Sequence, residues 1–138
     1  MENLPKPKAQ KLNEIIKLYA GVDCTATHGG DGTVSVTQYL DKLVVTATDL
    51  AEEEVLTITL PYGVQVISAR AITGTSVSSQ TFSVKDGESE IVELSNSAND
   101  TEKAVLHSFD ALDELTITAG SETGDWDGTF IFDIAVNE

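Results

Sequence analysis

From Asp23 onward, apolar residues alternate with threonine, serine or charged residues, and this period of two favours strands over helices. The clearest runs are LTITL at 56–60 and FIFDIAV at 130–136. Turn-forming segments such as GGDGT at 29–33 and KDGE at 85–88 separate the runs. We therefore expect residues 23–138 to form one all-β domain, an antiparallel β-sandwich or jelly roll of about eight strands.

Residues 56–73, LTITLPYGVQVISARAIT, contain two apolar runs that meet at a Pro-Tyr-Gly. Proline cannot donate to a central ladder and glycine permits a turn, so we expect two core strands joined by a tight corner. Val64 and Val66 share one face of the second run, whereas Ile67 begins the opposite phase. Such a change indicates a β-bulge or a strand that is buried on both faces.

The first 22 residues form an N-terminal arm in our interpretation, with one short amphipathic helix. Its apolar residues recur at i, i+3, i+4 and i+7, and they are Leu12, Ile15, Ile16 and Tyr19. Gly21 is placed to end the helix. A helix of about three turns is marginal alone in water, so this stripe must dock on the body or on a partner. The sequence leaves both possibilities open.

The charge of the chain is unevenly distributed. Four of its eight basic residues lie in the first 17 positions beside two acidic residues, and they are Lys6, Lys8, Lys11 and Lys17. That segment has a net charge of +2, and the other 121 residues, with four basic and 21 acidic side chains, have −17. So acidic a surface repels the phosphates of nucleic acids. A basic arm on an acidic body suggests a contact with an acidic neighbouring subunit, and a solvated tail is the alternative.

Few residues carry reactive groups, and they are dispersed. Cys24 is the only cysteine, which excludes an intrachain disulfide and favours a small, half-buried side chain. His28 stands beside glycines, where we expect a solvated loop histidine, and His107 lies in a different element. The sequence has no zinc-ligand spacing, nucleophile elbow or phosphate-binding loop. We therefore expect no enzymatic activity, no metal and no cofactor.

Two loop features leave alternatives open. Asp125 and Asp127 are spaced like the opening of a calcium loop, but the full calcium-loop pattern is missing and Asp-Gly is common turn chemistry. Trp126, between them, could cap the core, anchor an interface or stack on a sugar ring. Tyr62, in the predicted corner, has the same ambiguity.

The apolar runs are too short to span a membrane, and the first ten residues lack the apolar core of a signal peptide. We therefore expect a protein that is made and folded in a cytoplasm. No membrane partner is expected.

The order of corners, strands and turns in the second half of the chain supports a family resemblance. A Leu-Pro-x-Gly corner leads into a Val-rich strand at Leu60, Pro61, Gly63, Val64, Val66 and Ile67. A second strand and turn follow at Phe82, Val84, Asp86 and Gly87. Residues 115–138 read as a closing hairpin with a glycine-rich loop. This part of the chain resembles small virion structural proteins of tailed bacteriophages.

The resemblance implies a β domain that coats or cements a capsid, often as a trimer, without enzymatic activity. It implies the major capsid protein as partner, assembly in the host bacterial cytoplasm, and a place on the capsid surface of the virion. We take as candidate partner-binding residues Lys6, Lys8, Lys11, Leu12, Ile15, Ile16, Lys17, Tyr19, Tyr62 and Trp126. The alternative function is a receptor- or carbohydrate-binding module, such as a fibre head or adhesin, that uses Trp126 and Tyr62.

Overall fold

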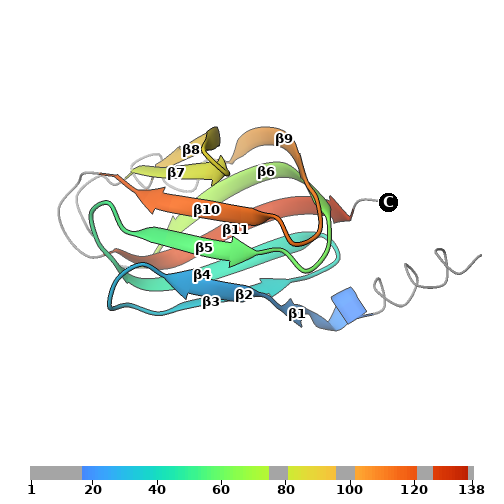
Figure 1. Cartoon of the computed structure of the whole chain (residues 1–138), viewed down its shortest axis with the longest axis horizontal. Coiled ribbons are helices and arrows are strands. Elements are labelled where there is room, and N and C mark those ends of the chain that lie inside the picture. The colour runs from blue at the N-terminus through green and yellow to red at the C-terminus, as the bar shows by residue number, and fades with distance from the viewer. Residues whose placement is uncertain (1–16, 75–80, 96–101, 121–125, 137–138) are drawn as a thin grey trace, which may run out of the picture.

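The computed structural model describes residues 17–74, 81–95, 102–120 and 126–136, which form two antiparallel sheets packed face to face (Figure 1). The six-stranded sheet contains, in spatial order, β1 (Val22–Asp23), β3 (Val34–Gln38), β4 (Lys42–Leu50), β11 (Trp126–Val136), β6 (Val64–Thr73) and β9 (Lys103–Phe109). The five-stranded sheet contains β2 (Thr25–His28), β5 (Val55–Thr59), β10 (Glu114–Ala119), β7 (Thr81–Asp86) and β8 (Ser89–Ser95). The predicted antiparallel β-sandwich is therefore confirmed, with eleven strands in the described residues.

The core lies between the sheets, and the alternating apolar residues fill it. On β5 and β10, Ile58 pairs with Leu115 and both side chains are buried, while Thr57 and Thr116 face outward. The apolar residues of the alternating pattern that are buried include Leu43, Val45, Ala47, Leu56, Leu60, Phe82, Val84, Ile117, Phe130, Phe132 and Ile134. The period of two therefore identified the inner face of most strands correctly.

At one edge of the sandwich, the chain crosses from one sheet to the other between β1 and β2. Cys24 sits at this crossing, and its N–H donates to the carbonyl oxygen of Val36 over 2.9 Å. Its thiol is half-buried, and this burial, with the nearby charge of Asp23, raises the pKa of Cys24 to about 11. A thiol in this state is a poor nucleophile at neutral pH.

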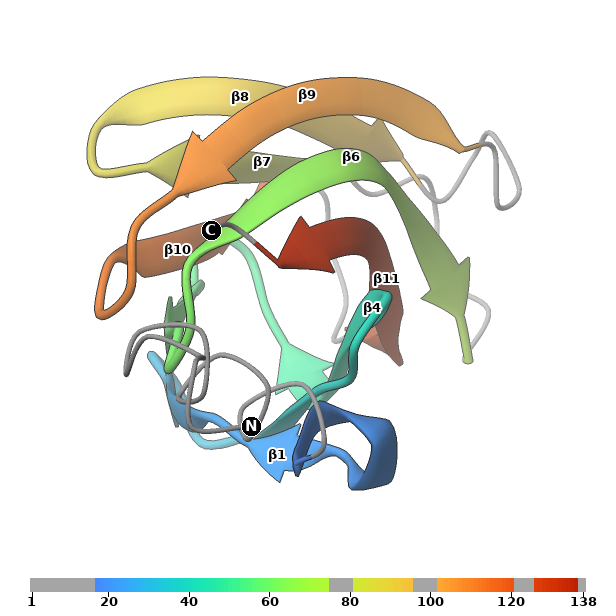
Figure 2. The ribbon, with the colours of Figure 1, turned by 90° about the vertical axis from the view of Figure 1, so that its right-hand side faces the viewer.

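At the other edge, β8 and β9 lie side by side, one from each sheet (Figure 2). His107 Nε2 on β9 lies 2.8 Å from Asp86 Oδ2 on β7, and Lys103 Nζ donates to the carbonyl oxygen of Glu93 over 2.8 Å. These two contacts link the two sheets at this edge. Lysine on an edge strand also discourages unwanted strand pairing.

The phase change after Val66 is a β-bulge, which is one of the two possibilities that the sequence left open. In β11, Asp133 pairs with Ser68 and the next residue, Ile134, pairs with Val66. Ile67 is therefore an extra residue on β6, and its side chain lies on the outer surface, 41% exposed.

A second irregularity lies beside the first, on β9. Two residues of β9, Val105 and Leu106, lie opposite Ile67. Leu106 has a φ of +54°, in the left-handed region, and its side chain is 69% exposed. Because bulges redirect side chains, the two irregularities together account for two aliphatic side chains on an outer sheet surface.

The described part of the N-terminal arm is one turn of helix at residues 17–20, next to β1 (Figure 2). Gly21 follows it with a φ of +92° and donates its N–H to the carbonyl oxygen of Leu18, which ends the helix as predicted. Leu18 is fully buried, whereas Tyr19 is 72% exposed. The side chain that enters the body is therefore Leu18 and not Tyr19, so contact with the body begins within the predicted arm of residues 1–22.

The other residues of the predicted stripe and the first basic residues lie outside the described residues, and they are Lys6, Lys8, Lys11, Leu12, Ile15 and Ile16. The assignment of residues 1–22 as a separate arm stays a prediction. Within the described parts of the chain, no helix has the length and apolar character that a membrane crossing requires.

Candidate partner-binding face

The outer surface of the six-stranded sheet carries aliphatic side chains on adjacent central strands. Val44 of β4 pairs with Ile131 of β11, and Ile72 of β6 pairs with Thr129 of β11. Val44, Ile72 and Ile131 are each half-buried although they point away from the core. The outer face of an antiparallel sheet normally presents polar side chains to water. We call this outer surface of the six-stranded sheet the apolar face.

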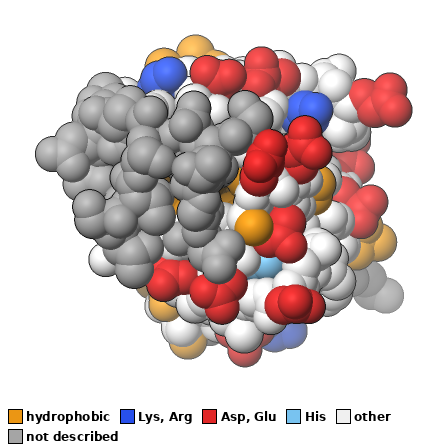
Figure 3. Space-filling model, turned by 90° about the vertical axis from the view of Figure 1, so that its left-hand side faces the viewer, with side chains coloured by type: hydrophobic (Ala, Val, Ile, Leu, Met, Phe, Trp, Pro, Cys, Tyr) orange, Lys and Arg blue, Asp and Glu red, His pale blue; other side chains and the backbone are white. Residues whose placement is uncertain are grey.

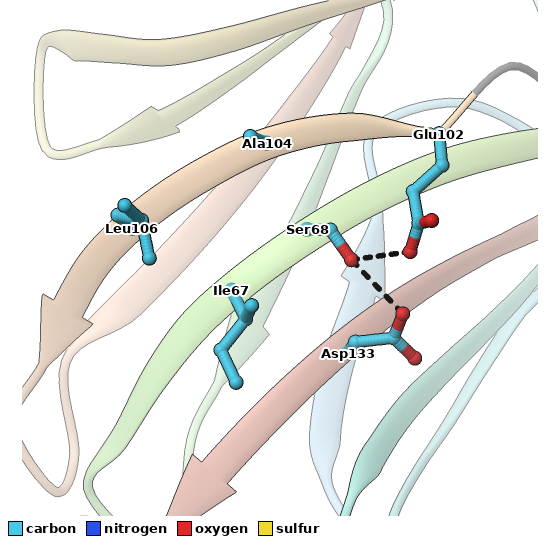
Figure 4. Close-up of a pocket in the computed structure, with 6 residues that line it drawn as sticks. All are labelled: Ile67, Ser68, Glu102, Ala104, Leu106 and Asp133. Atoms are coloured by element: carbon cyan, nitrogen blue, oxygen red, sulfur yellow. Dashed lines mark hydrogen bonds between the residues drawn. The ribbon is translucent and has the colours of Figure 1, made fainter.

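Two hollows lie on the apolar face, with volumes of about 480 and 460 Å³. The first, which we call the bulge hollow, is lined by Ile67, Ser68, Glu102, Ala104, Leu106 and Asp133 (Figure 4). The second, which we call the helix hollow, is lined by Leu18, Tyr19, Tyr39, Leu40, Asp41, Lys42 and Val44. Lys42 of the helix hollow pairs with Asp133 of the bulge hollow across β4 and β11, so the hollows are neighbours on one face.

The exposed apolar side chains gather at these hollows. Of the five exposed large apolar side chains among the described residues, Tyr19 and Tyr39 line the helix hollow, and Ile67 and Leu106 line the bulge hollow. A left-handed backbone costs a residue such as Leu106 about 1–2 kcal/mol, and an exposed side chain recovers little of that cost through burial. Exposed apolar side chains that cluster in this way indicate a surface that binds a partner.

The polar part of the bulge hollow contains two carboxyl groups that share one hydroxyl. Ser68 Oγ lies 2.5 Å from Glu102 Oε1 and 2.9 Å from Asp133 Oδ2 (Figure 4). Ser68 is on β6, Asp133 is on β11, and Glu102 immediately precedes β9. One hydroxyl hydrogen can serve only one carboxyl oxygen at a time, so the pair retains the capacity to accept hydrogen bonds from a cationic group.

The electrostatic surroundings favour a charged Asp133. A side-chain hydrogen bond with Glu102 is the largest cause that lowers the pKa of Asp133, and the bond with Ser68 adds to it. The positive charges of Lys42 and Arg70 act in the same direction, while desolvation opposes them. Asp133 therefore holds a negative charge on the apolar face between two basic side chains and a second carboxyl group.

The candidate residues from the sequence lie at different places. Lys17 is exposed, Tyr19 lines the helix hollow, and Tyr62 is half-buried in the corner between β5 and β6. Trp126 is fully buried, with its ring centroid 4.6 Å from that of Phe82 and 4.8 Å from that of Phe130. Of the three roles that the sequence left open for Trp126, this position fits the one in which it caps the core, and a fully buried ring offers no surface to a partner or a sugar.

His28 also differs from its prediction as a solvated loop residue. It lies in β2, and its Nδ1 accepts from the N–H of Gly30 over 2.9 Å. Its Nε2 lies 3.0 Å from the carbonyl oxygen of Thr48, and a carbonyl can only accept, so Nε2 carries the hydrogen. Both ring nitrogens of His28 therefore hold the loop after β2 against β4.

The candidate calcium loop places Asp127 in a structural role. Its Oδ1 accepts from the N–H of Asp49 over 2.7 Å, and Asp49 has a φ of +51°. Asp125 lies outside the described residues. Figure 3 shows Asp and Glu side chains around this end of the sandwich, but no group of three or more potential metal ligands occurs among the described residues.

No known family model matches the sequence, and no curated protein matches it. The apolar face is therefore identified by geometry, burial and charge. The apolar face is not evident from the sequence alone, because its aliphatic residues lie in strands whose other residues form the core.

Proposed function

We propose that this protein is a non-enzymatic virion structural protein of the capsid cement or decoration type, which attaches to a capsid through its apolar face. The observation that carries the proposal is the presence of four exposed apolar side chains in two neighbouring hollows on one sheet surface. The resemblance in residues 56–88 and 115–138 supplies the class of partner, the major capsid protein.

The build of the body supports this role. Its sandwich core is continuous, and groups that could react are used in structural contacts. The two ring nitrogens of His28 are hydrogen-bonded to the backbone, and the half-buried thiol of Cys24 lies 3.8 Å from the carbonyl oxygen of Val22. Cementing a shell requires a stable body that presents the same surface at many equivalent positions. The acidic body and the basic first 17 residues also favour attachment to surfaces of mixed charge.

Co-sedimentation with capsids tests the proposal. Purified protein is mixed with expanded, undecorated shells of a tailed phage and centrifuged at several salt concentrations. We expect saturable pelleting with the shells and a rise in the temperature at which the shells rupture. Protein that stays in the supernatant at low and moderate salt contradicts the proposal for that shell.

Receptor or carbohydrate binding is the weaker proposal. Its main candidate for sugar stacking, Trp126, lies in the core, which leaves Tyr62 as a half-buried aromatic residue in a corner. A glycan array separates the two functions. Binding to a defined glycan that is lost in Tyr62→Ala supports the carbohydrate-binding function. An array without any signal contradicts that function.

A further inference from the structure

We propose that the bulge hollow receives the N-terminal segment, residues 1–16, of a second copy of this chain. The inference deepens the proposed function, since it assigns one part of the apolar face to a neighbouring subunit and leaves the helix hollow and the Val44–Ile131 pair for the capsid. The partner is defined by its chemistry, which is a basic segment with an apolar stripe.

The hollow and the segment have matching side chains. Ile67 and Leu106 supply exposed aliphatic surface in the hollow, and Glu102 and Asp133 supply carboxyl oxygens that share a single hydroxyl hydrogen. The segment has lysines interleaved with aliphatic residues at helical spacing, at Lys8, Lys11, Leu12, Ile15 and Ile16. Lysine side chains can lay their apolar stems on the aliphatic surface while the ammonium groups meet the carboxylates.

The position of the bulge hollow favours a second copy over the chain's own segment. The hollow reaches the edge strand β9, so a segment that arrives from outside meets the exposed carboxyl group of Glu102 directly. The chain's own segment starts at Lys17 beside the helix hollow and must first cross Asp41 and Lys42 of that hollow. Because opposite charges attract, a lysine-rich segment reaches the carboxyl groups of the bulge hollow by the shorter path over β9.

The length of the segment suffices to reach a neighbour. Sixteen residues span about 24 Å as a helix, and more if extended. An arm that binds a different surface on the next copy makes a heterologous contact, and such contacts close into rings when the rotation permits. The arrangement is therefore compatible with the trimer that the family resemblance implies.

Mixed-label NMR tests the proposal on the full chain. A nitroxide is attached at Asn13→Cys, a position that lies off the apolar stripe, in a chain that also carries Cys24→Ser. This spin-labelled copy is mixed with unmodified copies that are labelled with nitrogen-15. We expect selective broadening of the amide signals of Ile67 and Leu106 in the labelled copy. A nitroxide at Glu88→Cys, in the exposed turn after β7, serves as the control and should leave these signals sharp.

Broadening that occurs only when nitroxide and nitrogen-15 are on the same chain would show that the segment docks on its own body, which overturns the proposal. Broadening elsewhere, or none, overturns it as well. The NMR experiment contains no capsids, so a negative result in it is distinct from failure of the capsid-binding proposal. A monomer can still satisfy the capsid-binding proposal.

Sedimentation velocity supplies a second test through a charge exchange. Glu102→Lys and Lys11→Glu should each weaken self-association by up to about fivefold, as expected for loss of an exposed ion pair. The double variant should recover most of the loss. Glu114→Lys makes the same charge change on the opposite sheet and should leave the association unchanged. Equal behaviour of Glu102→Lys and Glu114→Lys, or a full chain that is monomeric at all concentrations, contradicts the proposal.

Discussion

The two outer faces of the sandwich are built from the same kind of strand but carry different side chains. On the five-stranded sheet, β2, β5 and β10 turn threonines to the outside in register, so that Thr27, Thr57 and Thr116 form one row. We call this surface the threonine face. It carries none of the exposed large apolar side chains found among the described residues.

The difference in outward side chains distinguishes a face that suits water from the face that we propose binds a partner. Threonine fits a strand well because it is β-branched, and its hydroxyl remains compatible with solvent. At equivalent outward positions, the apolar face has Val44, Ile72 and Ile131 instead. Strand formation does not require these residues, and their apolar character is what the proposed attachment of this face to a partner would require.

The largest effect is expected in the core that supports both faces. Trp126→Ala should lower the free energy of unfolding by about 3–5 kcal/mol, because it removes a fully buried ring from a cluster with Phe82 and Phe130. Denaturant unfolding measures the change, with Tyr62→Ala as an aromatic control of smaller effect. A Trp126→Ala variant that is fully stable but loses binding would contradict the core position of Trp126 and would show that it contacts a partner directly.

A matched pair of leucines compares the bulge hollow with a site away from both faces. Leu106 and Leu112 are both exposed, at 69% and 74%, and both have positive φ, but Leu112 lies in the turn between β9 and β10. Asparagine tolerates positive φ, so neither Leu106→Asn nor Leu112→Asn should strain the backbone. We expect only Leu106→Asn to weaken self-association, by about tenfold, since it removes apolar surface from the contact.

The outcome of this comparison is read by sedimentation velocity over a range of protein concentrations. Equal losses in the two variants would show that exposed apolar surface in general, rather than the bulge hollow, drives association. A loss of self-association confined to Leu112→Asn would show that the contact lies at the turn between β9 and β10 and not at the bulge hollow.

The inner side of the apolar face contains a polar side chain whose replacement should stabilise the fold. Gln38 is fully buried at the end of β3, and neither amide atom has a hydrogen-bond partner among the described residues. Gln38→Met should raise the free energy of unfolding by about 1 kcal/mol, because an unsatisfied buried amide is costly. A destabilised variant would instead show that a segment outside the described residues bonds this amide.

The smallest expected effect is in the pH dependence of the bulge hollow. The pKa of Asp133 is lowered from 3.8 in the folded chain, so its charged form stabilises the fold above that value. This contribution is lost as the pH falls below about 4 through the lowered pKa. Asp133→Asn should flatten that part of the stability profile, measured by denaturant unfolding between pH 5 and pH 2. A stability profile of Asp133→Asn that is unchanged between pH 5 and pH 2 would contradict the hydrogen bonds assigned to Asp133.

The sequence predicted most of the fold because burial in a sandwich follows a period of two. It also located the phase change after Val66, since Val66 and Ile67 cannot both face inward in a regular strand, but it left a bulge and a strand buried on both faces as alternatives. The sequence could not reveal that Leu106 is exposed, because an apolar residue in a strand is normally assigned to the core. Its exposure depends on a left-handed backbone conformation, which is recognised only from the three-dimensional pairing of β9 with β6. The sequence also left the role of Trp126 open, because its glycine-rich neighbours suggested a loop, whereas Trp126 begins β11 and packs on Phe82, which is far away in sequence.

Exchanging the character of the two faces tests the central claim most directly. Val44→Thr with Ile131→Thr converts the apolar face toward a threonine face, and Thr57→Val with Thr116→Ile makes the reverse change on the opposite sheet. In co-sedimentation with shells, we predict that the first double variant loses about tenfold or more in affinity, because the contact loses apolar burial, while the second binds as the parent does. Undiminished binding of the first variant, or loss confined to the second, would contradict attachment through the apolar face.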